Sequence, residues 1–153
     1  MSENDTVRFS YGGFERFLSV LKDRFGSAGD SILFAMSRDF GRYDTKKMLE
    51  SGVFKEMEGD EKKIFEALLE GVEELGWGEH SLDVFDLIKG EIWVSIENSG
   101  LAGFCVDQGS PQCFFMKGSL SGILKEVTEQ DFFPEKVECD QEHSKCRILL
   151  KRP

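Results

Sequence analysis

Four cysteines are the residues of this 153-residue chain with the most evident chemistry: Cys105, Cys113, Cys139 and Cys146. The last two bracket a short polar loop in VECDQEHSKCRILL. In a hairpin, Cys139 shares the parity of Val137, and Cys146 shares that of Ile148, so both thiols face inward if the apolar residues do. Opposed cross-strand side chains approach within ~5 Å. Two inward thiols at the end of a hairpin therefore make half of a tetrahedral metal site.

Cys113 follows Pro111 near the start of a predicted helix, where the helix N-terminus favours thiolate over thiol. Three cysteines from two elements could then converge, provided that the helix begins beside the hairpin. The interval between Cys139 and Cys146 matches neither the zinc-ribbon nor the zinc-finger spacing. From spacing alone, buried thiols that act as small hydrophobic residues are favoured over a metal site.

Composition and charge exclude several classes of function. The net charge is −10 and the pI about 4.7, and an acidic surface repels both nucleic acid and anionic membranes. The N-terminus has no secretory-signal pattern, and no window reaches the ~20 apolar residues of a membrane span. We therefore expect a cytoplasmic protein, in which cysteines are thiols or metal ligands rather than disulfides.

Hydrophobic periodicity of 3.6 residues predicts three helices in the first half of the chain. The first covers about 11–25 and stops at Gly26. The second runs over 30–50, with Asp30 as its N-cap and a weak point at Gly41. The third follows Asp60 and carries the clearest apolar stripe.

The second half changes to strand-like patterns around one further helix. A hairpin is expected over 81–99, with Lys89 and Gly90 as a two-residue turn. A helix capped by Ser110 begins at Pro111, and a second hairpin with a looser turn starts at Val137. The order α-α-α-β-β-α-β-β predicts an α+β fold in one domain, residues 1–153, with helices packed on one face of an antiparallel sheet.

The stretch NSGLAGFCVDQGSPQCFFMKGSLSGIL, followed by VEC and HSKCRI, resembles the 4-vinyl reductase domain family. Members are also called hydrocarbon-binding domains, and the pattern recurs in the sensor domains of bacterial activators that respond to phenols and toluenes. The resemblance covers roughly 97–153. The matched features are Asn98-Ser99, Ala102, Pro111-x-Cys113, Gly118-x-x-Ser121-Gly122, Cys139 and Cys146.

The resemblance implies a structural zinc ion. In aromatic-sensing members, three cysteines and a glutamate hold zinc beside the ligand pocket, and Cys113, Cys139 and Cys146 match the three thiolate positions. Such a zinc would clamp the terminal hairpin to the helix that starts at Pro111. We expect no catalytic zinc, because no residue is placed as its general base.

The fourth zinc ligand stays open. Lys136 stands where the family has its glutamate, and a charged lysine cannot accept a metal. The hairpin loop is also one residue shorter than the family form. Glu135 and Glu138 flank Lys136, and each would need a bulge to reach the metal. The remaining options are His143, Cys105 and water. The alternative interpretation of His143 is an exposed loop residue, and that of Cys105 is a buried or reactive thiol.

A binding or sensing domain for a hydrophobic or aromatic small molecule is the function that the resemblance favours. The expected lining residues are Phe104, Phe114, Phe115 and Met116, for which plain core packing is the stronger interpretation. Without a helix-turn-helix or a Walker loop, any signal would pass to a separate partner.

Two alternatives remain: an accessory role in tetrapyrrole metabolism, and a dimeric scaffold that holds an acyl chain. An independent reductase is not expected, since no dinucleotide fingerprint is present, and no catalytic residue is assigned. We expect a homodimer. The small residues of GSLSG favour tight helix-to-sheet packing or a dimer contact over ligand contact.

Overall fold

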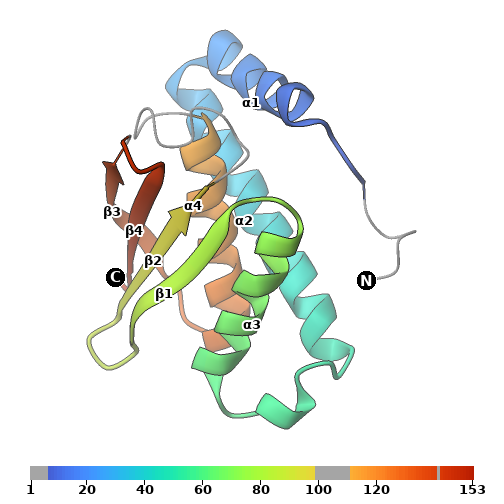
Figure 1. Cartoon of the computed structure of the whole chain (residues 1–153), viewed down its shortest axis with the longest axis vertical. Coiled ribbons are helices and arrows are strands. Elements are labelled where there is room, and N and C mark those ends of the chain that lie inside the picture. The colour runs from blue at the N-terminus through green and yellow to red at the C-terminus, as the bar shows by residue number, and fades with distance from the viewer. Residues whose placement is uncertain (1–6, 99–110, 141) are drawn as a thin grey trace.

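Three helices precede a β-hairpin, and a fourth helix separates that hairpin from a second one. The computed structural model describes residues 7–98, 111–140 and 142–153, without the side chains of 111 and 112. Its elements are α1 (Tyr11–Phe25), α2 (Ser27–Glu50), the short 3₁₀ helix η2 (Lys55–Met57), α3 (Glu61–Glu74), β1 (Glu79–Asp86), β2 (Glu91–Glu97), α4 (Pro111–Thr128), β3 (Phe133–Asp140) and β4 (Lys145–Lys151) (Figure 1). The predicted α+β class and element order are confirmed.

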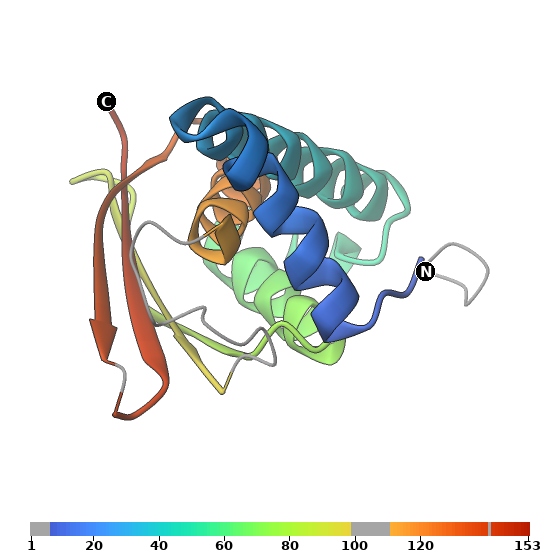
Figure 2. The same cartoon turned by 90° about the horizontal axis from the view of Figure 1, so that it is seen from above.

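The strands form one antiparallel sheet in the order β1-β2-β4-β3, in which β2 pairs with β4 and so joins the two hairpins. The helices lie together on one side of this sheet, as predicted (Figure 2). Alternation places Val94, Ile96 and Ile148 in the core between the two layers. The opposite face carries ion pairs between strands: Glu97–Lys145 joins the neighbours β2 and β4, and Asp83–Arg147 reaches from β1 across β2 to β4.

The helix boundaries follow local capping, with one correction to the prediction. α2 begins at Ser27 rather than at Asp30, because Gly26, with φ at 57°, is by itself enough to separate α1 from α2. The predicted weak point at Gly41 is also wrong, since α2 continues through it. α3 has the expected cap, in which the Asp60 carboxylate accepts from the Lys63 N–H group.

The two hairpin turns are both organised by an aspartate. The predicted two-residue turn is wrong, because β1 already ends at Asp86, whose Oδ1 accepts from the N–H groups of Ile88 and Lys89. This side-chain turn extends the connection to four residues. In the second hairpin, Asp140 Oδ1 accepts in the same way from the N–H group of His143. β3 begins at Phe133, before the predicted Val137.

Small residues of α4 bring its backbone against that of α2. A Cβ atom added to Gly118 would collide with the Phe34 carbonyl oxygen, and one added to Gly122 would collide with that of Arg38. From the other side, a Cβ atom on Gly41 would lie 2.5 Å from the Ser119 carbonyl oxygen. The small residues of GSLSG thus serve helix-to-helix packing, not the helix-to-sheet packing predicted.

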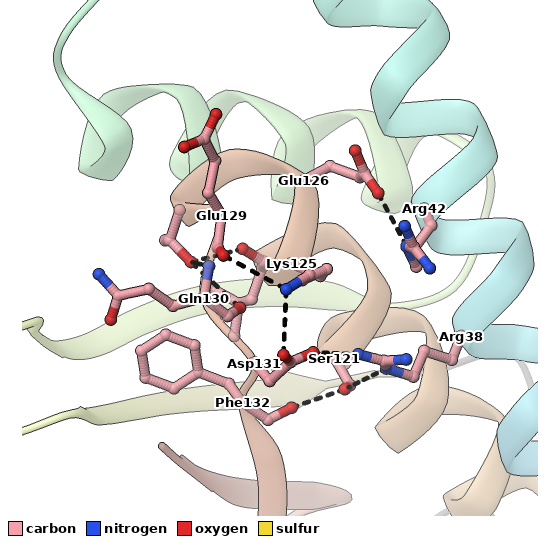
Figure 3. A network of polar contacts seen from close by, with 11 residues as sticks. Arg38, Arg42, Ser121, Lys125, Glu126, Glu129, Gln130, Asp131 and Phe132 are labelled. Atoms are coloured by element: carbon pink, nitrogen blue, oxygen red, sulfur yellow. Dashed lines mark hydrogen bonds and ion pairs between the residues drawn. The ribbon is translucent and has the colours of Figure 1, made fainter. Parts of the chain in front are cut away.

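Polar side chains lock this helix pair to the start of β3 (Figure 3). Arg38 of α2 donates through Nε to Ser121 Oγ at 3.2 Å, and its Nη2 donates to Asp131 Oδ1 at 2.6 Å. Ser121 Oγ donates in turn to the Phe132 carbonyl oxygen at 2.6 Å. Lys125 donates to the second oxygen of Asp131 at 3.0 Å. The contacts fix α4 between α2 and the sheet.

Candidate ligand-binding and thiol site

Cys139 and Cys146 face each other across the terminal hairpin. They are directly opposed in the β3–β4 register, and their Sγ atoms are 2.9 Å apart. Cys146 is fully buried in the core, and Cys139 is half-buried against it. The parity argument, which turned both thiols inward together, is confirmed.

The distance between the two sulfur atoms lies between the distance typical of two zinc-bound thiolates and that of a disulfide. Two thiolates on one tetrahedral zinc stand ~3.8 Å apart, whereas the sulfur atoms of a disulfide stand about 2.05 Å apart. From 2.9 Å, either state needs a change of about 0.9 Å. Small side-chain rotations therefore suffice for either.

Cys113 is also buried, in the first turn of α4. No group of three His, Cys, Asp or Glu side chains is close enough to hold a metal among the residues that the structure describes. Cys105 lies outside those residues. The structure thus brings Cys139 and Cys146 together, and the three-cysteine zinc site stays a prediction.

The candidate fourth ligands that the structure describes each contact another side chain instead of the thiols. Glu138 lies on the outer face of the sheet, where it pairs with Lys136 at 2.7 Å and with Arg147 at 3.5 Å. Glu135 contacts Lys151 at 3.4 Å, although a register shift beside it supplies the bulge that it would need to reach the metal. His143 is exposed in the turn and contacts Asp140 through Nδ1 at 2.7 Å. Each would have to give up an ion pair or hydrogen bond to reach the thiols.

An aromatic cluster lies between α1 and α4. It consists of Phe14 of α1, Trp77 of the α3–β1 connection and Phe115 of α4. The rings of Trp77 and Phe115 stack at 4.9 Å, and Phe14 meets each of them edge-on at 5.2 Å. Such edge-on and stacked geometries are the favourable ones for aromatic rings. This cluster is an apolar, ring-rich region between helices, and aromatic rings are the usual lining of sites for hydrophobic ligands.

The expected lining residues fall in different places. Phe115 belongs to the aromatic cluster and is 8% exposed, while Met116 is part of the core. Phe114 is partly buried beneath the Lys117 ammonium group. Phe104 lies outside the described residues. The prediction missed Phe14 and Trp77, because rings from three separate elements give no common spacing.

His80, at the start of β1, is a candidate site residue that the sequence analysis did not identify. Its Nδ1 lies 2.8 Å from the Gly78 carbonyl oxygen. A carbonyl oxygen only accepts, so Nδ1 carries the proton and Nε2 is the acceptor. Among the described residues, Nε2 is buried and has no hydrogen-bond partner. Burial lowers the pKa of His80, which favours this neutral form.

The position of His80 follows from the sheet register. His80 pairs with Ile96, which pairs in turn with Cys146, which faces Cys139. Directly paired residues point to the same face of a sheet. His80 and the two thiols therefore lie in one row on the inner face, with Ile96 between them. A lone histidine three residues after a tryptophan was the available signal in the sequence.

Within the described part of the chain, no helix is both long and apolar enough to cross a membrane. No family model matches the sequence, and no curated protein matches it either.

Solved structures do match. The phenol-responsive sensory domain of the transcription activator PoxR, solved with phenol, aligns at a TM-score of 0.75 with 15% identity, over 96% of this chain and 76% of that one. A vinyl-4-reductase family protein from Methanocaldococcus jannaschii aligns at 0.61 with 21% identity, over 98% and 85%. A trafficking protein particle complex subunit 3 from Naegleria fowleri, covalently bound to palmitic acid, aligns at 0.66 with 14% identity, over 94% and 90%.

These alignments confirm the predicted resemblance at the level of the fold: almost the whole chain has the architecture of a vinyl-4-reductase family protein and of a phenol-responsive sensory domain.

Proposed function

We propose that this chain is a binding domain for a small hydrophobic molecule that carries a hydroxyl group, with a phenol as the model ligand. The observation that carries the proposal is the buried Nε2 acceptor of His80, close in sequence to the aromatic cluster. A phenol-responsive domain that has the same fold supports it.

The chemistry of His80 sets the class of ligand. An acceptor buried without a donor costs about 1–3 kcal/mol, and a ligand O–H group would remove that cost. The rings of Phe14, Trp77 and Phe115 offer apolar faces to the rest of the molecule. A hydrocarbon without a hydroxyl group would leave Nε2 unsatisfied and bind more weakly.

Calorimetric titration of the full chain with phenol and with toluene tests this directly. We expect phenol to bind more tightly, by about 5-fold to 150-fold for one buried hydrogen bond. The variant His80→Phe should bind both molecules alike. Equal affinities for phenol and toluene in the unmodified chain would contradict the proposal.

An acyl chain is the second candidate ligand, because a neighbour of the same fold is covalently bound to palmitic acid. Native mass spectrometry of the purified chain separates the two cases: a retained fatty acid favours the acyl-chain scaffold. A visible chromophore retained on purification would instead favour the accessory role in tetrapyrrole metabolism.

We infer that a second copy of the chain packs on the exposed side of α2. Four apolar side chains, called here the α2 stripe, are exposed there at helical spacing: Ile32, Met36, Phe40 and Tyr43. Asp39 and Lys46 flank the stripe, two turns apart, and line an open depression of about 440 Å³ together with Phe40 and Tyr43. Antiparallel packing of two copies would place Asp39 of each opposite Lys46 of the other.

Light scattering on wild type and two charge variants tests the dimer. Phe40→Glu should shift the mass from dimer to monomer, because it places two charges in the interface. Ile88→Glu, at a side chain 93% exposed in the first hairpin turn, is the matched control and should stay dimeric. A monomeric wild type would contradict the proposed dimer.

Zinc bound by Cys113, Cys139 and Cys146 remains part of the proposal. It is supported by the pairing of the last two thiols. Elemental analysis of protein purified under reducing conditions should give one zinc per chain, lowered by Cys113→Ser. A metal-free wild type would contradict it.

A further inference from the structure

We propose that Cys139 and Cys146 form a reversible intramolecular disulfide, which makes the end of the terminal hairpin a redox modification site. The proposal rests on the arrangement of the two thiols and is independent of what the domain binds.

The backbone already has the geometry of a disulfide. Cys139 and Cys146 are direct partners in an antiparallel pair, and such partners have Cα atoms about 4.5–5.5 Å apart. Disulfides form at Cα separations of about 4.4–6.8 Å. The sulfur atoms lie 2.9 Å apart on the same face of the hairpin, so closing the bond moves side chains and leaves the strands in place.

The two thiols differ in access, which gives the reaction an order. Cys139 lies on β3, at the edge of the sheet, and is only half-buried. Cys146 lies on β4, inside the sheet, and is fully buried. An oxidant from solution therefore meets Cys139 first, and Cys146 is positioned to complete the reaction.

The oxidant is a low-molecular-weight disulfide, with oxidised glutathione as the probe. The Cys139 thiolate attacks one sulfur atom of the oxidant, which forms a mixed disulfide and releases one thiolate. The Cys146 thiolate then attacks Sγ of Cys139, which breaks the mixed disulfide and releases the second thiolate. Two protein thiols are oxidised, one small disulfide is reduced to two thiols, and the two protons pass to the released thiolates.

Oxidation would fix the turn end of β3. Only one further pair, Asp140–Lys145, lies between the two cysteines and the turn. A covalent link there holds the edge strand to the body of the sheet. The same thiols are two of the predicted zinc ligands, so oxidation and metal binding exclude each other.

Thiol counting on the chelator-treated chain tests the proposal. The reduced chain has four cysteines, and after equilibration with oxidised glutathione and denaturation we expect two reactive thiols. Peptide mapping should find the link between Cys139 and Cys146, and a dithiol reductant should restore all four thiols. Cys113→Ser, the matched control, should go from three thiols to one.

The variant Cys146→Ser tests the order of attack. Without the second thiol, the mixed disulfide on Cys139 cannot be resolved, so one glutathione should accumulate there and be visible in the intact mass. Four surviving thiols in the oxidised wild type would overturn the proposal, as would a mapped link that involves Cys113 or Cys105. Both of these readouts use the unmodified chain and do not depend on the folding of a variant.

Discussion

The ring of His80 is fixed by one hydrogen bond: its Nδ1–H group donates to the Gly78 carbonyl oxygen over 2.8 Å. This bond leaves Nε2 as a buried acceptor. The same nitrogen is where the imidazole would take up a proton, so the pH dependence of stability and the proposed recognition of a hydroxyl group involve one atom.

His80 should make the stability of the protein depend on pH. Burial lowers its pKa in the folded chain, so below the ordinary value of ~6.5 the unfolded chain binds more protons. Stability therefore falls as the pH drops through that value, with a slope of at most about 1.4 kcal/mol per pH unit for one proton. Urea unfolding between pH 8 and pH 5 measures it. His80→Gln should flatten the profile, and an unchanged slope would contradict this assignment.

Alanine at Gly118 or Gly122 should destabilise the fold. Either methyl group meets a backbone carbonyl of α2, and overpacking of this kind costs about 1–3 kcal/mol. Gly71→Ala, in α3, is the matched control, since beyond the neighbouring backbone of its own helix no atom of the described residues lies within 4 Å of its Cβ position. There the better helix propensity of alanine should stabilise the chain by about 0.5–1 kcal/mol. Thermal unfolding compares the variants, and equal melting temperatures for Gly118→Ala and Gly71→Ala would disprove the close helix contact.

The Arg38–Asp131–Lys125 contacts should weaken in acid. The hydrogen bond from Lys125 and the charges of Lys125 and Arg38 lower the pKa of Asp131. A carboxylate of this kind stabilises the fold above its ordinary pKa, and the contribution is lost as the pH falls through the lowered value. Asp131→Asn should lower the free energy of unfolding at neutral pH. In strong acid the difference in free energy of unfolding between this variant and wild type should become smaller. Because the carboxylate is solvent-accessible, added salt should also narrow it.

Trp77 should report ligand binding, and Trp93 should not. Trp77 stacks on Phe115 between the helices, whereas Trp93 lies on the outer face of the sheet beneath the Arg147 guanidinium, 4.6 Å from its ring centroid. The chain has two tryptophans, so Trp77→Phe and Trp93→Phe each leave one. Titration with phenol should change the fluorescence of Trp93→Phe alone. A response in Trp77→Phe would place the ligand elsewhere.

The regular part of the fold was predictable from the sequence, since it depends on local periodicity. The strand parity of Cys139 and Cys146 predicted their inward pairing because register and alternation act over neighbouring residues. The prediction of the first hairpin turn was wrong for a different local reason: the Asp86 carboxylate competes with the backbone for the N–H groups of the turn.

The candidate site was less accessible to prediction. Phe14, Trp77 and Phe115 meet only after α1, α3 and α4 have packed, and no spacing along the chain encodes that meeting. His80 has no motif, because its significance comes from burial and from a missing partner, both of which are properties of the folded state.

The glycine contacts between α2 and α4 have a mechanical consequence. Backbones this close, further tied by the Arg38–Ser121 hydrogen bond and the Arg42–Glu126 ion pair, cannot slide or separate by small amounts, so the two helices move as one stiff body. In α1, as the structure describes it, Leu18 is the one fully buried side chain. Phe14 of α1 supplies one ring of the aromatic cluster, so a molecule that enters between these rings would have to displace α1 from the stiff α2–α4 pair.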